Sequence, residues 1–490
     1  MATACKTSSE LSDRVTQARK AQREWAATPI RQRLQPVRRF RRLLVEQVDA
    51  LTQVIAREVG KSTTEALAGE VLGTADACRF LEQQATALLA PRRVSGRSRP
   101  IWLMGQSDVV HHRPRGVVGI IGTWNYPLFL NAVQILQALT AGNAVIWKPS
   151  EVVPGLAELL KQLLLAAGFP SGCVHCLPAQ RELGPLLAEA EIDHVVFTGS
   201  ARVGKTLAAR LGERLISSTL ELSGCDAQFV LDDAEVDLAA RATWFSLLLN
   251  RSQTCLAVRR VLVHRAVYQA YQQHLAALAA QNPSLQLTLA SQVTQADRLI
   301  EEAVHQGARL LVPRGASQGD TCQPGILVDA TPEMALCKEA PFAPIVAIMP
   351  FDNIEQALEM NDRCPFALGA SIFTKNIPQA QNLAQQLRVG SVAINDVIVP
   401  TSHPATPLGG SGESGWGVTQ GAEGLLEMTI PQVVSLRSGR FRPHYDMGDP
   451  RAMKQQGELL RGILQATHSP LLSQRLAGWW RVVRAVIWGG

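Results

Sequence analysis

The feature that most constrains this chain is a series of short apolar segments that alternate with helical patterns between residues 116 and 211. Strands that alternate with helices at this spacing form a parallel sheet covered by helices on both faces. The predicted strands are 116–122, 144–150, 173–177 and 194–200, and the predicted helices are 128 onward, 153–167, 181–190 and 203–211. Ligands bind such sheets at the carboxyl ends of the strands. Functional residues are therefore expected in the loops after these strands.

The rest of the chain divides into further regions. Residues 10–90 show helical periodicity, and residues 223–396 form a second α/β block. In that block we predict strands at 228–233, 260–265 and 392–399, helices at 266–280 and 296–306, and a glycine-rich closing stretch at 407–417. The length of 490 residues suggests two or three domains at about 150 residues each. Residues 437–490 differ in composition and form an appendix.

The net charge of the chain lies in this appendix. The whole chain has 48 basic and 42 acidic side chains, a net charge of +6. Residues 437–490 hold nine basic and three acidic side chains, so residues 1–436 are neutral overall. We therefore expect no nucleic-acid partner for the body of the protein. The arginines between residues 31 and 42 alternate with apolar side chains at helical spacing, which indicates the solvated face of an amphipathic helix.

The cysteines bear on compartment and metal binding. Nine cysteines scattered over a long chain are typical of reduced thiols, so we expect a cytoplasmic protein. Cys173 and Cys176 form a lone CxxC around His175, but no second ligand pair follows, and no metal site is expected. The sequence shows neither a run of about 18 apolar residues nor an apolar leader, so we expect no membrane span and no secretory signal.

Two strand ends carry residues that suit a nucleotide. FTGSARVGK (197–205) ends a strand and opens a helix, where Gly199 and Gly204 allow close backbone approach and the helix N-terminus favours a pyrophosphate. Lys148 and Glu151 form a pair that can hold ribose hydroxyls, and the carboxylate disfavours the 2′-phosphate of NADP. A tight turn and a surface ion pair explain the same residues without a ligand.

Three other residues suit acyl transfer. Cys255 offers a thiol, and Glu221 ends an apolar strand, where burial raises the pKa of a carboxyl and makes it a general base. Asn125 follows the first predicted strand, and its amide can donate to a developing oxyanion. Each residue alone is also explained by packing, but together they form a thiol, base and oxyanion-donor set.

These segments, taken in chain order, resemble the aldehyde dehydrogenase superfamily over roughly residues 10–436. The matching segments are TWNYP (123–127), WKPSE (147–151), FTGSxxVGK (197–205), Glu-Leu-x-Gly (221–224), Gln-x-Cys (253–255), PFAP (341–344), NDV (395–397) and PLGGSGESGWG (407–417). The spacing from Glu221 to Cys255 is also that of the family. The N-terminal lead, the NDV segment and the closing loop are most similar to the class 3 branch, which acts on fatty and aromatic aldehydes.

The resemblance implies an α/β fold with a Rossmann-type cofactor domain, a catalytic domain and a small bridging hairpin for oligomer formation. The implied boundaries are 1–97 with 115–222 for the cofactor domain, 223–424 for the catalytic domain, 98–114 with 425–436 for the bridging element, and 437–490 for the tail. The hairpin near 98–114 would pair with 425–436, and the chain would form a homodimer or homotetramer.

The resemblance also implies an oxidation of an aldehyde to a carboxylic acid with NAD, or with NADP. Cys255 would attack the carbonyl, the Asn125 amide and the Cys255 N–H would hold the oxyanion, and Glu221 would activate water to release the acid from a thioester. The implied cofactor contacts are Lys148 and Glu151 at the adenosine ribose, Ser200 with Gly199 and Gly204 at the pyrophosphate, and Trp124 and Phe342 beside the nicotinamide.

Three positions depart from the family pattern. The family places a nicotinamide-ribose Glu two residues before the Phe at 342, where this chain has Ala340, and Glu339 lies one residue further back. Ser252 stands in place of a Gly, and Cys225 in place of a frequent Lys. A non-catalytic relative, which Ala340 favours, therefore stays open. A CoA-acylating enzyme is the second alternative, and a hydrolytic Glu argues against it.

The end of the tail has the pattern of one amphipathic helix. In residues 469–490, leucine, valine and tryptophan side chains fall on one broad face, with arginines mostly opposite. Trp and Arg on such a helix suit a membrane interface. The alternatives are that the helix docks on the enzyme or on a partner copy, or that it stays disordered.

Overall fold

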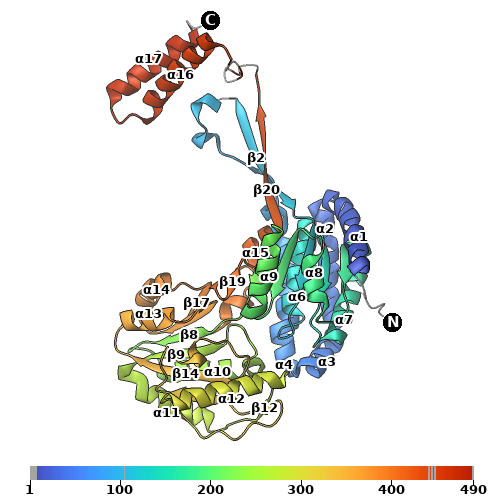
Figure 1. Ribbon diagram of the computed structural model, residues 1–490, viewed down its shortest axis with the longest axis vertical. Helices are drawn as coiled ribbons and strands as arrows, with labels where there is room; N and C mark the ends of the chain where they lie inside the picture. The colour runs from blue at the N-terminus through green and yellow to red at the C-terminus, as the bar shows by residue number, and fades with distance from the viewer. Residues whose placement is uncertain (1–7, 104, 440–441, 443–444, 446–447, 488–490) are drawn as a thin grey trace. The chain divides into compact units, whose positions relative to one another are not determined.

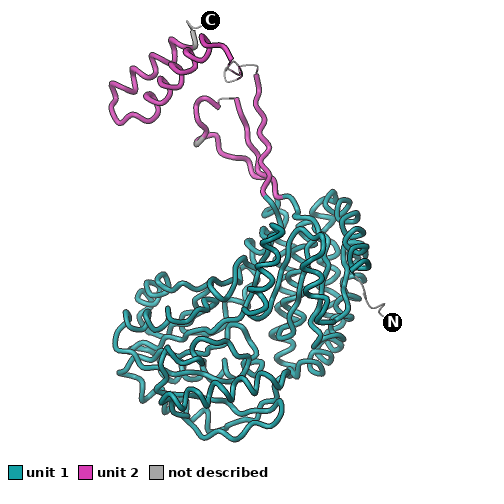
Figure 2. The backbone as a smooth tube through the Cα atoms, viewed as in Figure 1, with its two compact units in different colours: residues 1–89, 113–430 teal, residues 90–112, 431–490 magenta. Residues whose placement is uncertain are grey.

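The computed structural model describes residues 8–103, 105–439, 442, 445 and 448–487. The chain divides into two compact units, Met1–Leu89 with Arg113–Ile430 and Ala90–His112 with Pro431–Gly490 (Figure 2). Among the described residues, none of the helices is both long and apolar enough to cross a membrane.

The first sheet of the larger unit is the predicted parallel sheet (Figure 1). Its strands are β3 (Val117–Ile121), β4 (Ala144–Lys148), β5 (Val174–Cys176), β6 (His194–Thr198), β7 (Ser217–Glu221) and β19 (Gly415–Trp416), in the order β19-β7-β6-β3-β4-β5. The helices between them are α6 (Phe129–Ala141), α7 (Pro154–Ala166), α8 (Leu183–Glu189) and α9 (Ala201–Glu213). Every residue of β3 and β4 is buried, which explains their unbroken apolar sequences. The predicted alternation of strands and helices is confirmed.

The N-terminal helices pack against this sheet. They are α1 (Ser8–Ala27), α2 (Ile30–Glu46), α3 (Val48–Val59), α4 (Thr63–Ala66) and α5 (Gly73–Leu88), with a π-helical segment at Leu67–Leu72. The arginine-rich helix α2 buries its apolar stripe, as the spacing predicts, and Arg41 forms a two-pronged ion pair with Glu82. These arginines therefore belong to the solvent-facing side of an amphipathic helix whose apolar side is packed.

The second sheet of the larger unit has seven strands. They are β8 (Asp226–Val230), β9 (Val258–His264), β11 (Arg309–Leu310), β13 (Gly325–Val328), β14 (Ile345–Phe351), β16 (Gly369–Phe373) and β17 (Ser391–Ile394), in the order β11-β13-β14-β9-β8-β16-β17. Its helices are α10 (Val236–Leu248), α11 (Tyr268–Ala279), α12 (Ala290–His305), α13 (Ile354–Asp362) and α14 (Ile377–Gln386). The short pairs β10 (Leu285–Gln286) with β12 (Thr321–Cys322) and β15 (Phe366–Ala367) with β18 (Ser411–Gly412), and helix α15 (Gly421–Glu427), complete the unit.

The predicted strand 392–399 is confirmed for its first half and wrong for its second half. Strand β17 ends at Ile394 because Asn395 and Ile398 take left-handed backbone conformations, with φ of 57° and 66°. An apolar run cannot stay extended through such residues.

The smaller unit contains a three-stranded sheet and two helices. Its strands are β1 (Arg92–Arg93), β2 (Gln106–Pro114) and β20 (Thr429–Arg437), in the order β1-β2-β20. Strand β2 lies beside β20, so the expected pairing with the chain near 425–436 occurs. The hairpin does not lie within 98–114, however, because its first strand is β1 at Arg92–Arg93. The tail contains α16 (Pro450–His468), which the sequence pattern did not reveal, and α17 (Leu472–Ile487), the predicted amphipathic helix.

Candidate active site

A cleft of about 1050 Å³ opens at the carboxyl ends of β3, β4, β6 and β7. Nine of the ten predicted site residues line it: Trp124, Asn125, Lys148, Glu151, Gly199, Ser200, Glu221, Cys255 and Phe342. Gly204 does not. It lies inside α9, and a Cβ there would be 2.5 Å from the Leu222 side chain, so the structure gives it a packing position rather than a ligand-facing one.

Asn125 is held with its amide in one orientation. Its Oδ1 accepts a hydrogen bond from Thr123 Oγ1 at 2.9 Å, so its Nδ2 is the group that donates. That Nδ2 donates to the carbonyl of Gln253 at 3.1 Å, two residues before Cys255. An amide nitrogen carries two N–H groups. The second is therefore left for a ligand in the cleft beside the thiol.

The segment that leads to Cys255 has an unusual backbone. Asn250, Arg251 and Ser252 have φ values of 47°, 56° and 60°, three consecutive non-glycine residues in the left-handed region. Asn250 Nδ2 donates to the carbonyls of Asn125 and Gln253, at 3.0 and 3.1 Å, and so ties this segment to the Asn125 loop. Strained backbone of this kind is stable only when its surroundings fix it. Sequence reasoning missed Asn250, and nothing in its local pattern indicated this role.

The carbonyl groups of this segment have a buried cationic partner. Arg259 is fully buried, and its Nη2 donates to the carbonyls of Ser252 and Thr254 at 3.0 and 3.2 Å. The Gln253 side chain also holds this segment in place, because its Oε1 accepts a hydrogen bond from the Thr288 N–H at 2.9 Å. The position of Cys255 is therefore set by several independent hydrogen bonds.

Cys255 sits in an apolar setting. Leu130, Leu256, Leu368 and Leu408 form a small buried cluster against which the Cys255 side chain packs. Burial, and then the charges of Glu221 and Asp226, raise its pKa from 9.0 to about 12. The resting group is therefore a thiol at neutral pH, and its attack on a carbonyl requires a proton acceptor.

Glu221 is buried at the end of β7 and is held by uncharged partners. Thr419 Oγ1 donates to its Oε1, and Gln134 Nε2 donates to its Oε2 at 3.3 Å. Burial raises the pKa of Glu221 from 4.5 to about 7, against the smaller opposing effect of these hydrogen bonds. A carboxyl with such a pKa exchanges protons readily at neutral pH, as a general base must.

The glycine-rich loop brings Thr419 to Glu221. Strand β19 pairs antiparallel with β7, with Gly415 opposite Glu221. Gly415 has φ of 97°, and a Cβ there would lie 1.9 Å from the Leu220 carbonyl, so only glycine fits this close approach. The sequence identified the loop, but it did not indicate that Thr419 would reach the carboxylate.

A buried ion pair lies behind the Asn125 loop. Lys61 Nζ and Glu70 Oε1 are 2.6 Å apart, and both side chains are almost completely buried. Lys61 also lies over the ring of Tyr126, 3.6 Å from its centroid, and Tyr126 OH is 3.0 Å from Thr254 Oγ1. The pair thus connects the N-terminal helices to the residue that precedes Cys255. Sequence reasoning missed both Lys61 and Glu70.

The far end of the cleft fits a dinucleotide. Lys148 Nζ and Glu151 Oε2 are 3.1 Å apart at the end of β4. Ser200 caps helix α9, whose first N–H groups have no acceptor within the helix and so suit an anion. Gly199 leaves no room for a side chain, since a Cβ there would be 2.4 Å from the Phe197 ring. These features suit a ribose and a pyrophosphate.

Two aromatic rings also line the cleft. Trp124 and Phe342 meet edge to face, with ring centroids 5.9 Å apart. Glu339 and Ala340 also line the cleft, but Glu339 is bound by Arg298 Nη2 at 2.8 Å and by Gln295 Nε2 at 2.9 Å. Ala340 supplies no carboxylate. Neither residue therefore offers a free carboxylate to the cleft.

Cys225, the other departure from the family pattern, lies outside the cleft lining. It is buried, and its Sγ donates to the Cys337 carbonyl at 3.7 Å. Cys364 is the neighbouring thiol, and its pKa is lowered by a hydrogen bond from Cys225 and, more weakly, by the charge of Arg260. These cysteines form a cluster of their own.

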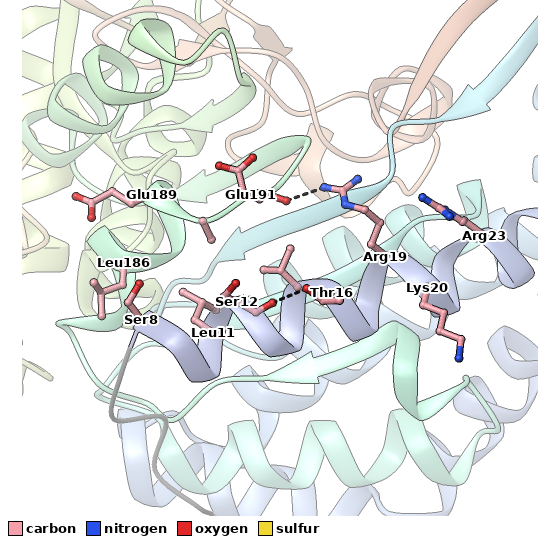
Figure 3. Close-up of a pocket in the computed structure, with 12 residues that line it drawn as sticks. Ser8, Leu11, Ser12, Thr16, Arg19, Lys20, Arg23, Leu186, Glu189 and Glu191 are labelled. Carbon is pink, nitrogen blue, oxygen red and sulfur yellow. Dashed lines mark hydrogen bonds between the residues drawn. The ribbon is translucent and has the colours of Figure 1, made fainter.

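A second hollow, of about 500 Å³, lies between α1 and the end of α8 (Figure 3). Arg19 lines this hollow and is already paired: it donates to Asp193 Oδ2 at 2.8 Å and to the Glu191 carbonyl at 2.6 Å. The hollow contains none of the predicted site residues. The large cleft is therefore the candidate active site.

Comparisons with known proteins agree with this geometry. A model of the aldehyde dehydrogenase family matches residues 1–434. The benzaldehyde dehydrogenase (NAD+) of Pseudomonas putida is 34% identical over 437 residues, which cover 86% of this chain and 88% of that protein. The 4,4′-diapolycopene aldehyde oxidase of a Methylomonas species is 32% identical over 432 residues, covering 86% of this chain and 80% of that protein.

Solved structures agree as well. The aldehyde dehydrogenase of Mycobacterium tuberculosis complexed with NAD+ is 28% identical and superposes with a TM-score of 0.83, covering 89% of this chain and 92% of that one. The NADP-dependent glyceraldehyde-3-phosphate dehydrogenase of Bacillus halodurans complexed with NADP is 29% identical, with a TM-score of 0.82 over 88% and 92% of the two chains. The chain therefore belongs to the aldehyde dehydrogenase family. It is an enzyme that oxidises aldehydes with NAD or NADP.

Proposed function

We propose that Cys255, Glu221 and Asn125 carry the chemistry of aldehyde oxidation in this enzyme. The observation that carries the proposal is that a thiol, a buried carboxyl and an oriented amide line one cleft. Cys255 Sγ bonds to the aldehyde carbon as the thiol proton passes to water in the cleft, giving the oxyanion of a thiohemiacetal. Asn125 Nδ2–H and the Cys255 N–H hydrogen-bond the oxyanion. NAD or NADP, when bound, supplies the acceptor for the hydride that leaves this carbon.

The thioester that remains on Cys255 is then hydrolysed. Glu221 takes a proton from water, the water oxygen bonds to the thioester carbon, and the C–S bond breaks to release the carboxylic acid and the thiol. Its pKa of about 7 suits this step, because the group is largely ionised just above neutral pH yet basic enough to accept a proton. Thr419 and Gln134 orient the carboxylate and act as positioning residues.

The remaining cleft residues are proposed to hold the cofactor. Lys148 and Glu151 bind the adenosine ribose, Ser200 and the α9 N-terminus bind the pyrophosphate, and Trp124 and Phe342 border the nicotinamide. The carboxylate of Glu151 favours NAD over NADP, because it repels a 2′-phosphate. In this assignment residues 1–97 with 115–222 form the cofactor domain and residues 223–424 the catalytic domain.

We propose an apolar aldehyde as the substrate. The apolar side chains around Cys255 are leucines, joined by the partly buried Tyr126 and Phe129. Two relatives are named for benzaldehyde and for diapolycopene aldehyde, both largely hydrocarbon. This preference agrees with a place near the class 3 branch, to which the NDV segment and the closing loop are similar.

The decisive experiment separates the two half-reactions. Purified enzyme is mixed rapidly with benzaldehyde and NAD, and NADH absorbance is followed. Cys255→Ala forms no NADH, whereas Glu221→Gln forms one NADH per active site and then stops. Cys176→Ala, a half-buried thiol on β5, is the matched control and keeps full turnover. Normal turnover by Glu221→Gln would remove Glu221 from the role of base.

The nature of the acyl acceptor is tested with the same reaction. With coenzyme A added, the wild-type enzyme yields free benzoate, because Glu221 directs water to the thioester. Formation of benzoyl-CoA as the main product would instead support a CoA-acylating enzyme.

Assembly and location complete the proposal. Strand β20 exposes Val433, Val434 and Leu436, which supports a second copy of the chain packing there in a homodimer or homotetramer. The reduced cysteines support a cytoplasmic location, with residues 469–490 in contact with a membrane surface. Light scattering after gel filtration tests the assembly, and a monomer at micromolar concentration would contradict it.

A further inference from the structure

Helices α16 and α17 form an antiparallel hairpin (Figure 1). Gln455 Nε2 near the start of α16 donates to the Ala485 carbonyl near the end of α17 at 3.0 Å. Glu458 forms an ion pair with Arg481 at 3.1 Å. The first contact joins the start of α16 to the end of α17 and the second joins the middles of the two helices, so the pairing is antiparallel.

The two helices touch through small residues. A Cβ on Gly478 would lie 2.4 Å from the Ala466 nitrogen and 2.7 Å from the Gly462 carbonyl oxygen, so the backbones meet directly. The buried residues of the hairpin are Gly462, Ile463, Ala466 and Gly478. Helices that pair in water normally bury large apolar side chains. Contacts through glycine and alanine are typical of helices whose outer surface faces an apolar medium.

The large apolar side chains of the hairpin point outward. Leu472, Leu476 and Val483 share one face of α17 by their spacing, and Leu472 and Trp480 are each 71% exposed. The exposed large apolar side chains in the described part of the hairpin are Met453, Leu460 and Leu464 on α16, Leu471 in the connection, and Leu472, Leu476, Trp479, Trp480 and Val483 on α17. The hairpin thus has its small residues inside and its large apolar residues outside.

The two exposed stripes lie on the same side of the hairpin. At about 100° per residue, the stripe of each helix is rotated by roughly 120–150° about the helix axis from the side that faces the other helix. The rotation has the same sense in both helices. Antiparallel helices are related by a twofold axis perpendicular to their common plane, so equal rotations bring both stripes to one face. The apolar residues of α16 and Leu472, Trp479 and Val483 of α17 therefore lie toward the same side of the hairpin.

The charge of the hairpin is strongly positive. Residues 450–487 contain six basic side chains, Arg451, Lys454, Arg461, Arg475, Arg481 and Arg484, and one acidic side chain, Glu458. A second copy of the chain would bring a second set of like charges to the same surface. A surface of anionic lipid headgroups complements this charge instead.

We propose that α16 and α17 together lie on a membrane surface that contains anionic lipid, with the apolar stripes at the level of the lipid headgroups. The inference deepens the membrane contact proposed above: it makes both helices the binding element and names the lipid class. Apolar stripes, tryptophans and flanking arginines are the features of helices that lie in the plane of a membrane interface.

Flotation of the full-length enzyme with liposomes tests this proposal. Vesicles of phosphatidylcholine alone are compared with vesicles that contain one quarter phosphatidylglycerol. The wild-type enzyme floats with the anionic vesicles, and at least ten times less floats with the neutral ones or in 0.5 M salt. Leu476→Asp with Trp480→Asp reduces flotation at least tenfold. The matched control is Leu215→Asp, an exposed leucine of the larger unit that is 93% exposed, and it floats like the wild type.

Two further measurements keep the result unambiguous. Each variant is assayed with a short, water-soluble aldehyde, for which the rate of NADH formation stays at the wild-type value, since the hairpin holds none of the proposed catalytic residues. A loss of flotation alone then concerns the hairpin and leaves the proposed chemistry untouched. The proposal is overturned if the wild type stays with the sedimenting fraction, or if the double variant floats equally well. It is also overturned if that variant turns an oligomer into a monomer without changing flotation, since the face would then be a contact between copies.

Discussion

The buried pair Lys61–Glu70 gives the sharpest test of how the catalytic loop is held. The two groups are 2.6 Å apart, with side chains 1% and 0% exposed. Glu70 Oε2 also accepts hydrogen bonds from the backbone N–H groups of Leu128 and Phe129, at 3.0 and 2.9 Å. Replacing Glu70 by Gln leaves the Lys61 ammonium buried without a charged partner. Breaking a buried pair in this way costs about 3–5 kcal/mol.

The double variant separates the cost of the unpaired charge from the value of the pair. In Lys61→Met with Glu70→Gln neither member of the pair is charged, and the amide oxygen of the introduced glutamine still accepts from the two N–H groups. Because replacing both members of a buried pair is often close to neutral, we expect the double variant to recover at least about 2 kcal/mol of what Glu70→Gln loses. Glu158→Gln is the control: it breaks an exposed pair with Lys161 and should cost less than about 1 kcal/mol.

Urea unfolding at pH 7.5, followed by tryptophan fluorescence, measures these free energies, and hydrogen exchange at Leu128 and Phe129 shows whether the loss is local. Faster exchange at those two amides accompanies the loss of stability if Glu70 holds the start of α6. A cost below about 1 kcal/mol for Glu70→Gln would refute the reasoning. A double variant less stable than the single one would refute it as well, because the unpaired charge would not be the cause.

Three other outcomes follow from the site. Burial raises the pKa of Glu221 from 4.5 to about 7, so its ionisation destabilises the folded state progressively as the pH rises from about 4.5 to 7. Measured by chemical denaturation at each pH, Glu221→Gln should therefore gain up to about 3 kcal/mol over the wild type at pH 8 and almost nothing below about pH 4.5. Ser252→Gly should stabilise the protein by roughly 0.5–1 kcal/mol, since φ of 60° is costly for serine, and a destabilised variant in the same assay would show that the serine hydroxyl matters more. At pH 7, iodoacetamide should modify Cys364 before Cys255, whose pKa is about 12, as read by peptide mass spectrometry; the reverse order would mean that Cys255 is already a thiolate.

The first sheet could be predicted because its strands are buried on both sides. Residues 117–121 and 144–148 are entirely buried, so their sequences are unbroken apolar runs that local pattern detects. Helix α16 was missed although it carries an apolar stripe, which is exposed; its contacts with α17 use glycine and alanine, which hydrophobic periodicity does not mark. Strand β17 was predicted too long because left-handed residues such as Ile398 carry no signal in hydrophobicity.

The site could be predicted only where a motif carries its own chemistry. Cys255, Glu221 and Asn125 stand in segments whose residue types suggest their roles. Thr419 and Asn250 act through contacts across the fold, with Thr419 reaching a carboxylate 198 positions earlier in the chain. Such contacts depend on where a distant loop packs against a strand, and hydrophobic periodicity does not predict that packing.

Glu70 and Glu221 show most clearly what the fold adds to the sequence. Both are buried glutamates beside helix α6, but only Glu221 stands in a segment whose sequence indicated a chemical role. The fold surrounds Glu70 with an ammonium and two backbone N–H groups, so its charge is fully compensated and it serves as an anchor. It surrounds Glu221 with hydroxyl and amide donors only, so burial dominates and its pKa rises to about 7. The same side chain thus becomes structural or reactive according to whether a buried cation reaches it.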